Sequence, residues 1–173
     1  MHKKRINPVA PADFDATQAE FFKPFLRPDG SIHNVYGTLA HHVDLAKAWS
    51  GFGLYTMRGS TVDPILREVA ILQAAKNSDC AYEFHHHAEI ARHLGLPEDD
   101  IEAIQAGTPL PAPDRALMVT CANDLSEYAK LSDATWGEMT ETFGLKTTFD
   151  VIFTIGAYST LALALNSCGV EID

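Results

Sequence analysis

Apolar residues recur every three or four positions along most of this chain, which is the spacing of amphipathic α-helices. No segment has the run of alternating β-branched residues that marks a strand. The pattern therefore predicts an all-α protein with about eight helices in a single domain. The predicted helices cover residues 17–26, 34–57, 64–77, 80–94, 97–107, 114–131, 132–144 and 148–169.

Capping residues mark the ends of several of these helices. Asp63 followed by Pro64 is a strong start signal, because the Asp side chain accepts from free amides and proline suits the first helical position. Asp79 is placed to cap the helix that follows it, and Gly95 is placed to end that helix. Gly144 is expected to end the helix that begins after residue 132.

The stretch 151–170 has no charged residue and is long enough to cross a bilayer. It also contains Asn, Ser, Thr and Tyr side chains, and no basic cluster flanks it to set an orientation in a membrane. A helix that is apolar on nearly every side is typical of a core or a subunit interface. We therefore predict a homo-oligomer and no membrane partner.

Composition narrows the classes of function. The chain has 173 residues, of which 46% are hydrophobic and 21% charged, and this suits one globular domain. Its formal net charge of −10 argues against nucleic acid as a partner. The start of the chain has no apolar signal segment, and three widely spaced cysteines do not suggest a disulfide framework. A cytoplasmic location is therefore expected.

Four chemically reactive residues lie on inward faces of two neighbouring helices. Cys80, Glu83 and His87 are spaced i, i+3 and i+7, and at about 100° per residue they share one helical stripe. Glu68 lies on the apolar face of the preceding helix, and a helix break separates it from Cys80. Two antiparallel helices would bring Glu68 beside His87 or Cys80. Arg67 lies on a different face and is expected in solvent.

The thiol is subject to opposing effects. Cys80 is expected in the first helical turn, where the helix dipole stabilises a thiolate, whereas nearby carboxylates raise the pKa of a thiol. We expect a thiol only modestly more acidic than normal. A structural interpretation also stands, because a buried cysteine is often a small hydrophobe and a Glu–His pair at i, i+4 often only stabilises a helix.

Three consecutive histidines, 85–87, suggest a metal site at first sight. Consecutive helical residues diverge by about 100°, so the three rings cannot bind one ion. Glu83 with His87, joined by His33, His41 or His42, would be an alternative, but nothing in the spacing fixes that geometry. We predict no metal and no cofactor, and we expect the first two histidines of the tract to be solvated or interfacial.

These residues are set in longer motifs that resemble the carboxymuconolactone decarboxylase and alkyl hydroperoxidase D superfamily. The resemblance covers residues 13–173 and leaves 1–12 as an N-terminal tail. It implies an all-α oligomer, often a trimer or hexamer. The motifs that carry it are LREVAIL (66–72), CAYEFHHHAEIARHLGL (80–96), EDDIEAI (98–104) and FTIGAYSTLALALNSCGV (153–170).

The hydroperoxidase branch is similar to this chain in having Glu, then CxxC, then His four residues later. These positions correspond here to Glu68, Cys80, Glu83 and His87, so Glu83 stands where that branch has its second cysteine. A carboxylate cannot form a disulfide. The two-cysteine reductase chemistry of that branch is therefore not expected.

The decarboxylase branch removes CO2 from a lactone carboxylate in aromatic catabolism. The resemblance implies a lyase that acts on a small carboxylated metabolite. In such a reaction, Glu68 and His87 are candidates for acid–base roles, with Glu83 orienting His87.

Substrate-binding candidates and alternatives remain open. Tyr82 and Arg92 are candidate substrate-binding residues, with Arg58 as another cation for a carboxylate. One alternative function is a thiol peroxidase that uses Cys80 without a CxxC pair. Another is a non-catalytic oligomeric protein that keeps the fold.

Overall fold

The computed structural model describes residues 3–173, and within that range it contains helices and no strand, apart from an isolated antiparallel bridge between Leu26 and Ile32. The prediction of an all-α fold is confirmed. The α-helices are α1 (Ala16–Phe22), α2 (Asn34–Leu39), α3 (Val43–Leu54), α4 (Pro64–Asn77), α5 (Ala81–Leu94), α6 (Glu98–Ala106), α7 (Pro113–Tyr128) and α8 (Asp133–Cys168). A π-helical turn, Tyr55–Gly59, extends α3.

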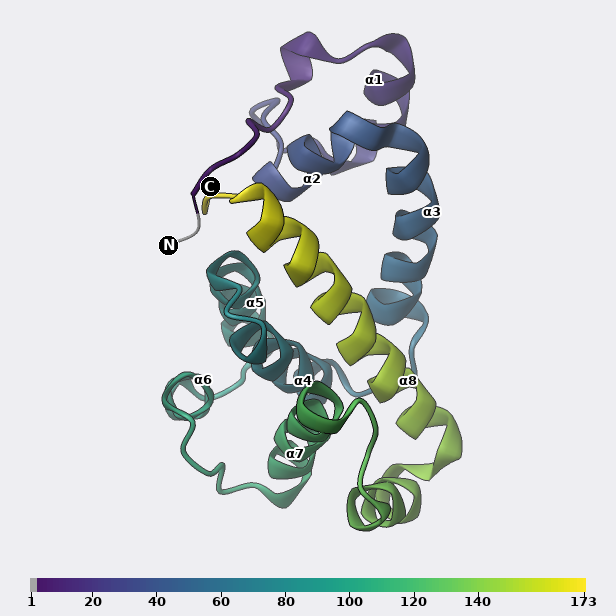
Figure 1. The fold of residues 1–173 in the computed structure, drawn as a ribbon, viewed down its shortest axis with the longest axis vertical. Coiled ribbons are helices and arrows are strands. Elements are labelled where there is room, and N and C mark those ends of the chain that lie inside the picture. The colour runs from purple at the N-terminus through teal and green to yellow at the C-terminus, as the bar shows by residue number, and fades with distance from the viewer. Residues whose placement is uncertain (1–2) are drawn as a thin grey trace.

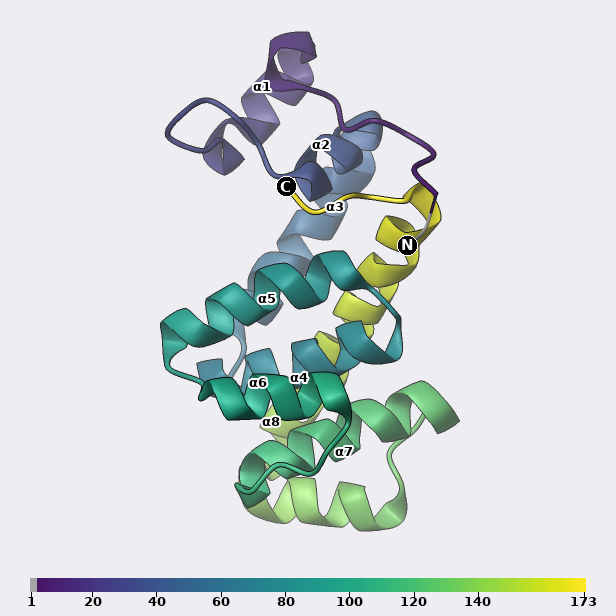
Figure 2. The same ribbon diagram turned by 90° about the vertical axis from the view of Figure 1, so that its left-hand side faces the viewer.

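The helices form two groups that α8 joins. Figure 1 shows α1, α2 and α3 at one end of the molecule and α4 to α7 at the other, with α8 running diagonally between them. Turned by 90°, the molecule shows α5 lying above α4 and α6, with α7 below them (Figure 2). Helix α4 contacts α5, α6, α7 and α8, so it is the centre of the larger group.

Helix α4 is buried over ten consecutive residues, 66–75, and this run includes Arg67, Glu68 and Gln73. A helix surrounded on all sides has no solvated face for its polar residues. Each buried polar group therefore needs a partner within the protein. The centre of the core is thus also the place where polar chemistry is concentrated.

Most predicted helix ends are confirmed. The Asp63 side chain accepts from the amides of Ile65 and Leu66, and Pro64 is the first residue of α4. Gly95 ends α5 with φ 95°. The prediction that Asp79 caps α5 is wrong: Cys80 is the N-cap, and Asp79 lies in the turn before it with φ 49°.

Helix α8 contains the break that the sequence predicts at Gly144. This glycine has φ 79° and ψ 162°, so two helical segments meet there at a kink. By length and composition, α8 is the one helix within residues 3–173 that could cross a membrane, although a core helix passes the same test. It packs against α4 and α7, as predicted for a central helix.

The described part of the N-terminal tail runs beside the end of α8. The amide of Arg5 donates to the carbonyl of Cys168, and Lys4 forms an ion pair with Glu171. Farther along, the amide of Val9 donates to the carbonyl of Gly37 in α2. These contacts bring the first described residues close to the C-terminal segment, as Figure 1 shows.

Candidate functional site

Glu68 and His87 form a direct contact between α4 and α5. Glu68 Oε2 lies 2.7 Å from His87 Nδ1, and the Glu68 side chain is fully buried. This confirms the prediction that the two residues meet across the helix break. A carboxylate at Nδ1 fixes the orientation of the ring and leaves Nε2 as the nitrogen for proton transfer.

Arg67 completes this pair. Its Nε and Nη2 atoms both donate to Glu68 Oε1 at 3.1 Å, and Nη1 donates to the carbonyl of Met57 at 2.9 Å. Arg67 is buried, so the prediction that it lies in solvent is wrong. The helical pattern predicted a solvated face, but α4 has neighbours on every side. The guanidinium compensates the charge of Glu68, which a dry core requires.

Glu83 is buried beside Cys80 with no comparable compensation. Neither carboxyl oxygen has a hydrogen bond of normal geometry, although the Cys80 thiol is close enough to interact with the carboxylate. Burial raises the pKa of Glu83 to about 8, and the thiol only partly opposes this. At neutral pH, Glu83 is therefore mainly a neutral carboxylic acid, able to donate a proton.

Cys80 is held as a thiol. Burial and the negative charge of Glu83 raise the pKa of Cys80 to about 12, although backbone amides of the first helical turn act in the opposite direction. The sequence-based prediction of a slightly acidic thiol is therefore wrong. The amides are present as predicted, but the loss of solvation outweighs them.

Two tyrosines join the site from outside the two central helices. The ring of Tyr158, on α8, meets the ring of His87 edge-on, with centroids 4.7 Å apart, and its hydroxyl lies 2.9 Å from the sulfur of Met57. Burial and the charges of Glu68 and Glu83 raise the pKa of Tyr158. The pKa of Tyr36, on α2, is also raised by burial. Sequence reasoning missed both residues, because each is far along the chain from the motif.

Glu83 does not take the orienting role that the sequence assigned to it. The hydrogen bond to His87 comes from Glu68, although Glu83 and His87 share one helix at i, i+4. A carboxylate on the facing helix points directly at the ring edge. Glu83 is turned toward Cys80 instead.

The two substrate-binding candidates lie apart from this group. Arg92 is exposed and forms a two-pronged ion pair with Glu98, at 2.6 and 2.7 Å. The Tyr82 hydroxyl donates to Asp173 and accepts from the amide of Val35, which ties α5 to the C-terminal segment and α2. Arg58 lies exposed in the π-helical turn and acts electrostatically on Tyr36.

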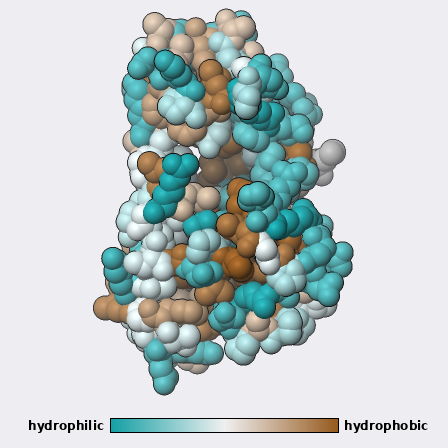
Figure 3. Space-filling view, turned by 180° about the vertical axis from the view of Figure 1, so that it is seen from behind, coloured by the Kyte–Doolittle hydropathy of each residue, from teal (hydrophilic) through white to brown (hydrophobic). Residues whose placement is uncertain are grey.

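Two open surface depressions lie elsewhere. One is lined by residues of α7, α8 and the segment between them, including Leu131 and Trp136, and the other by residues around Asp63 and Arg115. Neither is lined by the four motif residues. Figure 3 shows a separate hollow between the two ends of the molecule, with apolar side chains gathered beside it.

Comparisons with known proteins agree with the resemblance inferred from the motifs. The carboxymuconolactone decarboxylase family model matches residues 44–112, a stretch that contains all four motif residues. No curated protein shows significant sequence similarity to the chain.

Solved structures of low sequence identity share the fold. An uncharacterized peroxidase-related protein from Silicibacter sp. TM1040 has a TM-score of 0.82 at 19% identity, covering 99% of this chain and 95% of that one. A peroxidase-related protein with an alkylhydroperoxidase core from Ralstonia eutropha JMP134 has a TM-score of 0.76 at 16% identity, covering 97% and 94%. A protein of unknown function from Agrobacterium tumefaciens, a putative antioxidant defence protein, has a TM-score of 0.70 at 18% identity, covering 78% and 94%.

Proposed function

We propose that this protein is a lyase that decarboxylates a small carboxylated, lactone-type metabolite by acid–base catalysis. The observation that carries the proposal is the pairing of a neutral, buried Glu83 with a Glu68–His87 hydrogen bond in one site. Such a site holds one group ready to donate a proton and a second group oriented to transfer one. The family model that matches this stretch supports the same class of chemistry.

In the proposed reaction, the bond between the substrate carbon and its carboxylate breaks and CO2 leaves. The electron pair stays on the carbon as an enolate conjugated with the lactone carbonyl. Glu83 donates its proton to that carbon and becomes a carboxylate. His87, oriented through Nδ1 by Glu68, then returns a proton from solvent to Glu83, so that each turnover consumes one proton and releases one CO2.

The substrate carboxylate needs a cation that is not already paired. Arg67 is committed to Glu68, and Arg92 to Glu98. Arg58 is exposed at the edge of the site near Tyr36, and it is our candidate for this role. Arg92, which the sequence suggested, is assigned no contact with substrate.

A thiol peroxidase is the second candidate, because two proteins of similar fold are called peroxidase-related and Cys80 occupies the motif position. Against it, the raised pKa of Cys80 leaves very little thiolate, which is the form that attacks a peroxide. Glu83 also provides no second thiol to resolve an oxidised Cys80.

One experiment separates the two functions. Purified protein is assayed for CO2 release from carboxymuconolactone and for hydroperoxide consumption with a dithiol, using wild type, Cys80→Ser and the exposed control Glu102→Gln. The proposal expects decarboxylation that Cys80→Ser lowers by less than about tenfold, since the thiol transfers no proton. Hydroperoxide turnover that Cys80→Ser abolishes, with no decarboxylation, would establish the peroxidase instead.

We also propose that the chain works as a cytoplasmic homo-oligomer. Large apolar side chains remain exposed on α3 and α8, among them Phe52, Phe149 and Phe153, whose rings form a continuous series of contacts. An exposed aromatic patch of this kind is typical of a subunit interface. A monomer mass by light scattering at micromolar concentration would contradict this proposal.

A further inference from the structure

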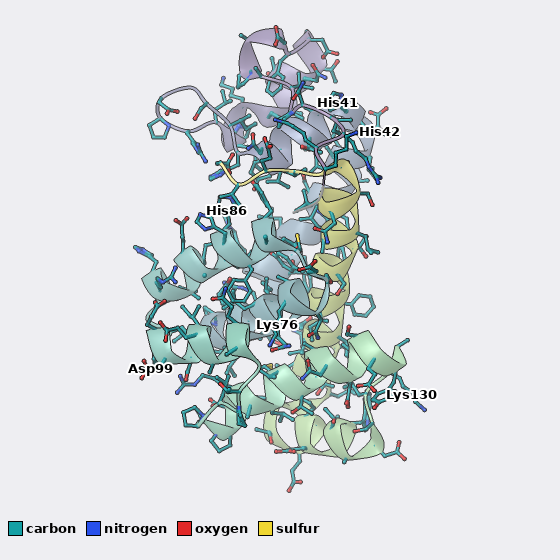
Figure 4. The ribbon with its side chains drawn as sticks, turned by 60° about the vertical axis from the view of Figure 1, so that its left-hand side comes forward. His41, His42, Lys76, His86, Asp99 and Lys130 are labelled. Carbon is teal, nitrogen blue, oxygen red and sulfur yellow. The ribbon has the colours of Figure 1, made fainter. Side chains whose placement is uncertain are left out.

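A second group of polar side chains lies outside the motif. His33 is the N-cap of α2, His86 lies on α5, and Asp173 follows α8. Asp173 Oδ2 lies 2.9 Å from His33 Nδ1 and 3.0 Å from His86 Nε2, and the ligand atoms of all three residues lie within 4.8 Å of one another. Figure 4 shows His86 between α5 and the C-terminal segment. Three distant parts of the chain therefore converge on one point.

We propose that His33, His86 and Asp173 form a binding site for a divalent cation of the Zn²⁺ type. Two imidazole nitrogens and one carboxylate oxygen are a common ligand set for this ion, with a fourth position left for water or another ligand. Ligand atoms about 2.0–2.1 Å from a tetrahedral ion are about 3.3 Å from one another. The observed separations from Asp173 would need to widen by only a few tenths of an ångström.

The state of His86 supports this site. Its Nε2 atom is buried and has no hydrogen bond of normal geometry, despite its short distance to Asp173. On the other side of the ring, Glu89 Oε2 lies 4.0 Å from Nδ1. That distance is beyond a hydrogen bond, so this exposed carboxylate acts on the ring only through its charge.

Asp173 is held in place before any ion binds. The amide of Asn34 donates to Oδ1 at 2.6 Å, and the Tyr82 hydroxyl donates to Oδ2 at 3.0 Å. One oxygen is thus fixed by the backbone, while the other faces both histidines. A carboxylate that is already oriented loses less conformational freedom when it binds a ligand.

His33 Nδ1 lies beside both a hydrogen-bond donor and an acceptor, and no single tautomer of the ring can pair with both. Its Nδ1 atom lies 2.6 Å from Nη2 of Arg27, which only donates, and 2.9 Å from Asp173 Oδ2, which accepts. Arg27 also lies 3.5 Å from Asp173, and its side chain is partly exposed to solvent. A cation between the two groups would accept the lone pair of His33 Nδ1 and bind the Asp173 carboxylate. Arg27 would compete with the cation for these two groups.

The test uses tag-free, full-length protein treated with a chelator and then titrated with Zn²⁺ by calorimetry. The visible spectrum of the Co²⁺ form reports tetrahedral coordination independently of any activity. We expect one ion per chain, and we expect His86→Ala and Asp173→Asn each to weaken binding by about 10²-fold or more. The exposed control His93→Ala should bind as wild type does, and Arg27→Gln should bind more tightly.

Two outcomes would overturn the site. The first is that His33→Gln, His86→Ala and Asp173→Asn all bind Zn²⁺ as wild type does. The second is that His85→Ala removes binding while Asp173→Asn does not, since the ion would then sit on the neighbouring His85–His86–Glu89 group. Circular dichroism of each variant checks that the fold is kept, and Asp173→Asn, a conservative change at the last residue, serves where a histidine variant does not fold.

Discussion

Glu68 and Glu83 are both buried carboxyl groups of the same site, yet their surroundings differ. Glu68 receives two donors from Arg67 on one oxygen and contacts His87 on the other. Glu83 has only a thiol nearby and no hydrogen bond of normal geometry. The first environment fixes the carboxylate between two partners, so that it can orient His87, and the second favours a neutral acid. Two identical side chains thereby take different chemical roles.

The comparison also explains Cys80. Here burial affects both members of the Cys80–Glu83 pair, and it raises the pKa of each. Both groups of the Cys80–Glu83 pair are therefore mainly protonated at neutral pH, whereas the Glu68–His87 pair is arranged to transfer a proton.

The largest expected effect concerns thiol reactivity. A pKa of about 12 in place of 9.0 leaves Cys80 with about 10³-fold less thiolate at neutral pH, and Cys121 is raised to a similar value by burial. Cys168 is only half-buried. We expect iodoacetamide to label Cys168 first and Cys80 far more slowly, as measured by mass spectrometry over a pH series. Rapid labelling of Cys80 below pH 7 would mean that burial and Glu83 do not suppress its ionisation.

The next effect tests the orienting role of Glu68. Replacing Glu68 with Gln keeps the shape but removes the carboxylate that holds His87 Nδ1, and it leaves the guanidinium of Arg67 buried without its partner charge. We expect kcat/KM for decarboxylation to fall by ~10²-fold or more. Glu102→Gln is the matched exposed control. A loss below about threefold in a folded Glu68→Gln protein would remove Glu68 from the mechanism.

The sequence predicts much of this arrangement, because helix ends and inward faces depend on local residues. Asp63, Pro64, Gly95 and Gly144 mark boundaries by capping and turn chemistry, which neighbouring residues decide. Spacing alone also indicated that Glu68 would meet a partner on the next helix. Local patterns do not show which faces of α4 become buried when α7 and α8 pack against it.

The features that the sequence did not predict all depend on tertiary packing. Arg67 is buried because α4 is enclosed on every side, and Tyr158 reaches His87 from a helix that lies far along the chain. The pKa of Glu83 depends on how completely its surroundings exclude water. The meeting of His33, His86 and Asp173 requires the C-terminal segment to lie between α2 and α5, which no sequence spacing indicates.

The third prediction concerns stability as a function of pH. The pKa of Glu83 is about 8 in the folded protein and near 4.5 when exposed, so folding takes up a proton between these values. The free energy of unfolding should therefore fall as pH rises through this window and become level above it. Glu83→Gln should flatten this dependence and gain roughly 4 kcal/mol over wild type at pH 8.

Denaturant unfolding of both proteins at several pH values measures this difference. Glu102→Gln is a suitable control, since Glu102 lies exposed on α6. Glu83→Gln also tests the catalytic role, because its neutral amide cannot donate the proton that we assign to Glu83. Equal pH dependence in wild type and Glu83→Gln would show that the Glu83 carboxyl does not hold its proton as we propose.

The smallest expected effect comes from Tyr158, the remaining titratable group in contact with the pair. Its raised pKa keeps the hydroxyl protonated at neutral pH, and that hydroxyl donates a hydrogen bond to the sulfur of Met57. We therefore assign the ring a positioning role against His87. Tyr158→Phe, which keeps the ring, should lower kcat/KM by less than about threefold, whereas Tyr158→Ala should lower it by ~10-fold or more and shift the pH profile as His87 loses its support. A ~10²-fold loss in Tyr158→Phe would make the phenol the proton donor, and the division of roles between Glu68 and Glu83 would then be incomplete.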